Sequence, residues 1–334
     1  MLTRKLKIIN NKKLKYVILS FIVLCCIVCF ALSPKYYMQQ TLLGLEVFAK
    51  NVFPSLFPFF VFSKILTGLN CVSDFARYFG KATNKLYNTS GISAYAFTLA
   101  IISGYPVGAK VVSELYEQKQ LTQDEVNRVI TFTSTSGPLF IIGTVGVGML
   151  NSFKCGVIML VCHIIASLLN GLIYRNKGVT NKKIYSNYQT DFIAPDINKV
   201  ISESVFNSVI SILNVGAYIV IFFVLISLIN SLHLLTPICF ILNKIGFSYA
   251  NANAFLNGIV EITRGCLDIS KLNISLRLKT ILCGTVISFG GFSVAFQGFA
   301  FLSKCKVKFG FFIKQKITHC FLSVILLCLF CFLI

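Results

Sequence analysis

Charged residues are scarce in this sequence, and acidic residues are the scarcest. Only 13% of its 334 residues are charged and 11 are Asp or Glu, whereas soluble domains are about a quarter charged. Hydrophobic residues take their place, at 56% of the chain, and the mean hydropathy is +0.79. This composition excludes an ordinary soluble domain and predicts an all-α polytopic membrane protein.

The residue arrangements on which enzymes depend are also missing. We find no nucleophile–base spacing, no phosphate-binding loop and no redox motif. Neither a pair of Cys-x-x-Cys motifs nor a histidine cluster indicates a metal site. The 13 cysteines lie mostly inside apolar runs, where they resemble small buried hydrophobic residues. We therefore expect no enzymatic activity, no resident cofactor and no metal.

The net charge of +20 does not indicate nucleic-acid binding. The charges lie in the connectors between apolar segments, as the rule on cytoplasmic Lys and Arg predicts for membrane proteins. The expected partners are the lipid bilayer and a small-molecule anion, without nucleic acid. The sequence leaves open whether the protein forms a homo-oligomer.

A basic segment, residues 1–15, precedes the apolar run Tyr16–Leu32. The following Ser33-Pro34-Lys35 lacks the small-residue pattern of a cleavage site, so we expect an uncleaved spanning helix with its basic end in the cytoplasm. A cleaved signal peptide is the alternative. We divide the chain into an N-terminal unit (1–35), a first gate-type repeat (36–175), a polar basic linker (176–200) and a second repeat (201–334).

The stretch Thr133–Gly148 is polar where its surroundings are apolar. It opens with four hydroxyl residues, followed by Gly137 and Pro138. Because proline lacks an N–H and clashes with the preceding turn, we expect a helix to end near Ser134 and a new one to start after Pro138. Such a break is tolerated at membrane depth only inside protein or a water-filled cavity. It is typical of transporters, because the new helix N-terminus can face an anion.

The same order of features recurs 156 positions later. The matched features are Thr133–Gly148 with Phe289–Lys304, His163 and Ser167 with His319 and Ser323, and Ser103–Gly108 with Ile259–Arg264. Weak internal symmetry with paired interruptions is the sequence pattern of a two-repeat transporter. We therefore predict two inverted repeats with broken or re-entrant helices around one midplane site, after one extra N-terminal helix.

Glu261 and Arg264 are charged residues beside an apolar segment. Ionisable groups inside a membrane are costly and are functional candidates by default. Glu261 is a candidate to carry a coupling proton or to orient Arg264, and Arg264 is a candidate to hold a carboxylate in its planar fork. The alternative is an ion pair between residues three apart, which neutralises itself near the headgroups.

Two other features have both a functional and a structural interpretation. Ser103–Pro106 is either a helix break whose backbone binds substrate or a proline kink with close glycine packing. His163 and His319 are either a proton relay or, more commonly, histidines hydrogen-bonded within the bundle.

The sequence leaves open whether the coupling ion is H⁺ or Na⁺. The expected substrate-binding residues are Ser103, Gly104, Tyr105, Pro106, Thr135, Ser136, Gly137, Glu261, Thr263, Arg264, Gly290, Gly291, Ser293 and Gln297.

Four motifs in order, spread over nearly the whole chain, resemble a known family. They are Phe53–Phe60, Ser103–Lys110, Thr133–Phe140 and Ser288–Ser293. The set resembles the sporulation integral membrane protein YlbJ (SpoVV) family, which carries the gate or nucleoside-recognition domain and is similar in architecture to concentrative nucleoside transporters. Glu261–Gly265 resembles that family's acidic–Thr–Gly element. One position departs from the family's Thr-Ser-x-Pro-Leu-Phe motif. At the position marked x we expect Asp, and this sequence has Gly137.

The resemblance implies a role in spore formation. The protein would move dipicolinic acid from the mother cell across the outer forespore membrane of a spore-forming bacterium, or act in its cell membrane. An aromatic dicarboxylate suits half-helix N-termini, one arginine, hydroxyls and aromatic faces. Two alternatives stay open, a transporter of nucleoside-like molecules and a non-transporting membrane scaffold of the spore envelope.

Overall fold

The computed structural model describes residues 2–69, 72–178 and 196–333, and all the regular elements within them are helical. Four of the described helices are long and apolar enough to cross a membrane, or five if one bent pair forms a single span. This confirms the expected all-α, multi-pass membrane protein. Most of the expected linker, 176–200, lies outside the described residues.

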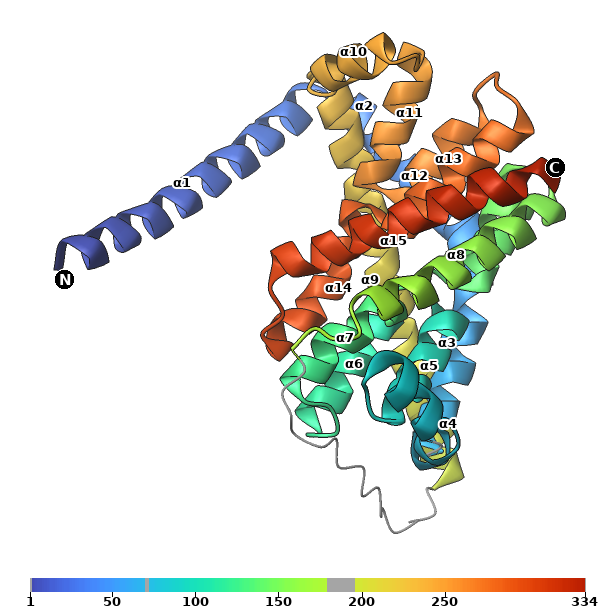
Figure 1. The fold of residues 1–334 in the computed structure, drawn as a ribbon. Coiled ribbons are helices and arrows are strands. Elements are labelled where there is room, and N and C mark those ends of the chain that lie inside the picture. Colours follow the sequence, from blue (N-terminus) through green and yellow to red (C-terminus); the bar gives the residue numbers. More distant parts are fainter. Residues whose placement is uncertain (1, 70–71, 179–195, 334) are drawn as a thin grey trace.

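The chain begins with two helices that meet at a sharp bend. Helix α1 (Leu2–Leu32) extends away from the body of the molecule, and α2 (Pro34–Val47) packs against the long helix α9 (Ile197–Ser231) (Figure 1). The two segments differ in direction by 103°. Pro34 opens α2, a position at which the missing N–H costs no helical hydrogen bond.

The first half of the body contains a helical hairpin and a broken helix. Helices α5 and α6 pack against each other with Gly104–Pro106 at the tip, and the chain between α7 and η2 is not helical. Thr122 and Glu125 form a capping box at the start of α7. The elements are η1 (Phe48–Val52), α3 (Phe53–Gly68), α4 (Val72–Tyr87), α5 (Ile92–Ser103), α6 (Val107–Glu117), α7 (Gln123–Thr133), η2 (Leu139–Met149) and α8 (Phe153–Ile173).

The second half repeats this order of elements. A long helix and a short one are followed by a second hairpin, α11 with α12, then by a broken helix and a closing span. Only Glu261 separates the two arms of the second hairpin. After α9 the elements are α10 (Thr236–Lys244), α11 (Tyr249–Val260), α12 (Ile262–Ser270), α13 (Leu276–Phe289), α14 (Gly291–Leu302), η3 (Ser303–Cys305), α15 (Phe309–Phe330) and η4 (Cys331–Leu333).

Both helix breaks expected from the sequence are confirmed. Helix α7 ends at Thr133 and η2 begins at Leu139, directly after Pro138. Helix α13 ends at Phe289, and Gly290 follows in the left-handed conformation with φ 87°. Glycine adopts this conformation without the steric cost that a Cβ brings.

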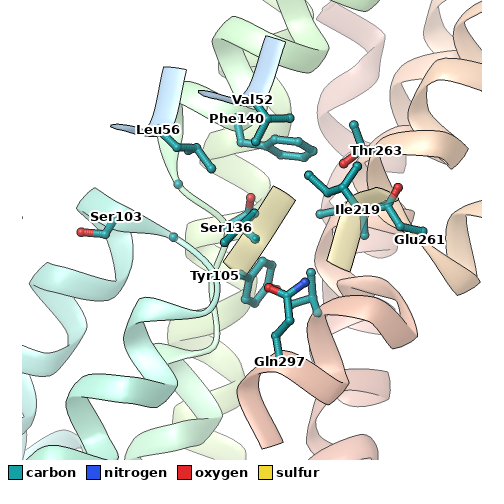
Figure 2. Close-up of a pocket in the computed structure, with 15 residues that line it drawn as sticks. Val52, Leu56, Ser103, Tyr105, Ser136, Phe140, Ile219, Glu261, Thr263 and Gln297 are labelled. Atoms are coloured by element: carbon teal, nitrogen blue, oxygen red, sulfur yellow. The ribbon is translucent and has the colours of Figure 1, made fainter. Parts of the chain in front are cut away.

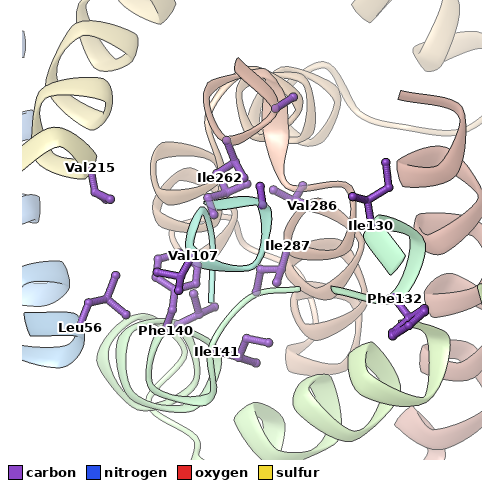
Figure 3. Packing of buried hydrophobic residues seen from close by; sticks show 14 of the residues in the cluster. Leu56, Val107, Ile130, Phe132, Phe140, Ile141, Val215, Ile262, Val286 and Ile287 are labelled. Carbon is purple, nitrogen blue, oxygen red and sulfur yellow. The ribbon is translucent and has the colours of Figure 1, made fainter. Parts of the chain in front are cut away.

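The two halves meet in an apolar core. Figure 3 shows Val107 and Phe140 of the first half packed near Ile262 and Val286 of the second. The closing spans α8 and α15 lie side by side (Figure 1). Their histidines, matched by the repeat spacing, are in ring contact, with centroids 4.7 Å apart. Dense packing of this kind has little freedom to relax, so it fixes the positions of the breaks relative to each other.

The repeated element order and the meeting of His163 with His319 agree with a two-repeat chain. That the repeats are inverted, with their boundaries at 36–175 and 201–334, stays a prediction.

Candidate functional site

A small cavity lies where the two hairpin tips meet the first helix break (Figure 2). Its volume is about 40 Å³, room for a few water molecules at most. An organic substrate therefore requires a more open conformation. The lining residues are Val52, Leu56, Ser103, Gly104, Tyr105, Ser136, Gly137, Phe140, Val215, Ile219, Glu261, Ile262, Thr263, Val294 and Gln297.

The first hairpin tip touches the first helix break through backbone alone. Gly104 has φ 70°, and a Cβ placed on it would lie 2.3 Å from the backbone nitrogen of Gly137. No side chain fits there, so glycine is required both for the turn and for the close approach. This approach brings Ser136 and Tyr105 to the same wall of the cavity.

His163 holds the first break in place from behind the cavity. The Ser136 N–H donates to its Nε2 at 2.9 Å, so Nε2 is an acceptor and Nδ1 carries the proton. Nδ1 then donates to the Ser288 hydroxyl at 2.9 Å, and Ser288 donates to Ser323 at 2.8 Å. His319 Nε2 contacts the His163 carbonyl at 3.1 Å. Both histidines are thus hydrogen-bonded within the bundle, which is the structural alternative to a proton relay.

Glu261 forms the tip of the second hairpin. Its carboxyl group accepts the backbone N–H of Arg264 at 2.7 Å and so caps α12. It is 1% exposed and lines the cavity beside Thr263. The second tip therefore presents an acidic group where the first presents an uncharged turn.

The ion pair between Glu261 and Arg264, which was the structural alternative, does not form. Arg264 Nε instead donates to both carboxylate oxygens of Asp268, at 3.0 and 3.1 Å, and Nη1 donates to Gln40 at 3.2 Å. The Glu261 carboxyl is directed at the backbone as a cap, whereas Asp268 stands one turn along the same helix, in reach of the guanidinium. Arg264 lies outside the cavity lining and links the second hairpin to α2.

The structure brings together more than half of the expected site residues. The cavity is lined by Ser103, Gly104, Tyr105, Ser136, Gly137, Glu261, Thr263 and Gln297, whereas Pro106, Thr135, Arg264, Gly290, Gly291 and Ser293 are not in its lining. The buried hydroxyls of Ser103, Thr135 and Ser293 have no hydrogen-bond partner among the described residues. In Figure 2 the Ser103 hydroxyl points away from Ser136. Substrate binding by any of these residues stays a prediction.

Sequence reasoning missed Lys316. Charges are expected in the connectors between apolar segments, but Lys316 is fully buried in α15. Its Nζ donates to the Ser134 carbonyl at 3.1 Å and to the Tyr105 hydroxyl, and lies 4.1 Å from the centre of the Tyr105 ring. Lys316, His319 and Ser323 follow each other at helical spacing on one face. That polar stripe in an apolar helix was the available signal.

Comparison with known proteins supports the resemblance noted in the motifs. No family model matches the chain. It is 27% identical over 319 residues to the sporulation integral membrane protein YlbJ of Bacillus subtilis (strain 168). The match covers 89% of this chain and 78% of the relative.

Solved structures of a concentrative nucleoside transporter, CNTnw, share the fold. A variant in the intermediate 1 state gives a TM-score of 0.53 at 15% identity, covering 84% of this chain and 76% of that one. A second variant, in an outward-facing state, gives 0.53 at 14% identity, with 86% and 77% covered. The likeness confirms the expected architecture, and at this identity it concerns the fold alone.

Proposed function

We propose that this chain belongs to the sporulation integral membrane protein YlbJ family and transports a small anion across a membrane of the sporulating cell. The proposed substrate is dipicolinic acid and the proposed location is the outer forespore membrane. Support comes from the relative named for sporulation and from the transporter fold.

The observation that carries the proposal is the meeting of two hairpin tips and a helix break at one cavity. Ser103, Ser136 and Glu261 come from three separate interruptions and line the same space. Buried polar backbone and a buried carboxyl group are costly at membrane depth. A scaffold has no use for such an arrangement, whereas a carrier needs it to bind a polar solute midway.

The lining chemistry suits a planar aromatic acid. Ser136 and Gly137 lie just before the N-terminus of η2, where backbone N–H groups and the helix dipole favour negative charge. Thr263 and Gln297 add a hydroxyl and an amide. The cavity must open before a ring can enter.

A nucleoside-like substrate is the second candidate, favoured by Glu261 and Gln297. A carboxyl group and an amide in the same cavity match the hydrogen-bonding edges of a ribose or a base. The carboxylate also disfavours a dianion by charge repulsion. Competition between dipicolinate and a nucleoside in an uptake assay distinguishes these two candidate substrates.

Reconstitution tests the proposal. Purified protein in liposomes is expected to take up labelled dipicolinate saturably, with no reduction by a tenfold excess of unlabelled nucleoside. If excess nucleoside abolished dipicolinate uptake, the nucleoside-like substrate would be favoured instead. If monodisperse protein transported neither substrate, the non-transporting membrane scaffold would be the remaining candidate.

A further inference from the structure

Lys316 is a buried cation without an acidic partner. It is 0% exposed, and within residues 2–69, 72–178 and 196–333 no carboxylate forms an ion pair with it. An isolated charge in a membrane protein is expensive unless other groups compensate for it. The contacts of its ammonium group therefore show what compensates for its charge.

Those contacts lie at the C-terminal ends of two half-helices and on one tyrosine side chain. The Ser134 carbonyl, at the end of α7, accepts a hydrogen bond from Nζ at 3.1 Å. Gly290 caps the end of α13, and a Cβ placed on it would lie 3.2 Å from Nζ. Tyr105, which follows the last residue and cap of α5, supplies its hydroxyl oxygen and its ring face. Helix C-terminal ends carry partial negative charge, so the ends of α7 and α13 favour a cation between them.

This surrounding is that of a small-cation site. In transporters with interrupted helices, unwound carbonyls and half-helix C-terminal ends coordinate the coupling Na⁺ or H⁺. Here a carbonyl oxygen, a hydroxyl oxygen and the ends of two helices surround the ammonium group of a side chain anchored in α15.

We propose that the Lys316 ammonium is the resident cation of the transport site, held where a coupling Na⁺ would otherwise bind, so that transport requires no Na⁺. The inference rests on the proposed transport function. It also gives the cavity a fixed positive charge behind Tyr105, whose side chain lines it. Because the Tyr105 oxygen accepts from Nζ, its own O–H is directed elsewhere, to the Ile287 carbonyl at 3.5 Å or to a substrate oxygen.

Uptake by the wild-type protein in two salts tests the inference without any substitution. Labelled dipicolinate uptake into proteoliposomes is measured in sodium chloride and in choline chloride. We expect rates that differ by less than about fivefold, the lower end of a typical coupling between two sites. A larger fall without Na⁺ would overturn the inference and leave the proposed function intact. No uptake in either salt would refute the proposed function, and the inference with it.

Lys316→Ala provides the second arm, with the exposed Lys314→Ala on the same helix as matched control. We expect Lys316→Ala to lose uptake in choline chloride and to regain at least about fivefold in sodium chloride, because the freed oxygens can bind the ion. Lys314→Ala is expected to match the wild type in both salts. Equal uptake by Lys316→Ala in the two salts, whether normal or absent, overturns the assignment. If the variant does not reach the membrane, the wild-type comparison decides.

Discussion

The two halves of the molecule share an order of elements but differ in the chemistry of matching positions. The first hairpin tip is Gly104-Tyr105-Pro106, uncharged and pressed against the break of its own half. The second tip is Glu261, an acidic cap whose hairpin is tied to α2 through Arg264 and Gln40. The shared order thus builds one cavity, and the differences give its walls different chemistry.

The closing spans differ in the same way. His163 and His319 meet, but only His163 accepts a backbone N–H from a helix break. At the same repeat spacing, Lys316 of α15 corresponds to Leu160 of α8. The positive charge at the site therefore comes from one half alone. A pure duplicate would have two such charges or none, so this position shows where the halves diverged in chemistry.

The largest expected effect is at the glycines where two backbone segments touch within each half. We expect Gly104→Ala in the first half and Gly265→Ala in the second to cost about 3 kcal/mol or more. The added Cβ atoms would lie 2.3 Å from Gly137 N and 2.0 Å from Gly258 Cα. Thermal unfolding in detergent measures the loss. Gly143→Ala, with nothing within 4 Å of the new Cβ, is the neutral control. If either of these two variants were as stable as that control, the close approach would be wrong for that half.

The two histidines should differ although they are matched in sequence. His163→Leu leaves the buried Ser136 N–H without an acceptor and should cost about 1–3 kcal/mol. His319→Leu removes a contact to a carbonyl inside α8 and the ring contact with His163, but it leaves no backbone N–H without an acceptor and should cost less. Denaturation of the two variants side by side measures the difference. Equal costs would mean that the first break does not depend on His163.

The two charged residues of the second hairpin should separate stability from transport. Arg264→Ala should lower stability by about 1–3 kcal/mol, because it leaves the Asp268 carboxylate, whose side chain is 18% exposed, without its cation, while uptake per molecule stays normal. Glu261→Gln keeps an oxygen that can cap α12 but removes the acidic group from the cavity, so uptake should change more than stability does. Uptake normalised to membrane level measures both. If Arg264→Ala lost uptake per molecule, Arg264 would take part in substrate binding after all.

The helix breaks could be predicted from the sequence, but the residues that each buried charged side chain contacts could not. Pro138 and Gly290 restrict local backbone geometry, so both breaks were predictable from residue type and spacing. Arg264 had acidic neighbours on either side, Glu261 and Asp268, and only the cap geometry decides between them. Lys316 was missed because polarity was judged along the chain, whereas its burial depends on how α15 packs against α8.

Equilibrium binding of tritiated dipicolinate to purified protein, by scintillation proximity, shows whether the substrate binds between the hairpin tips. The wild type is compared with Ser136→Val, which adds apolar volume to the small cavity while keeping the backbone N–H bonded to His163. The account predicts saturable binding by the wild type and affinity at least about tenfold weaker in the variant, a loss of roughly 1.4 kcal/mol. Undiminished binding by a folded Ser136→Val protein would place the substrate elsewhere and contradict a site between the hairpin tips.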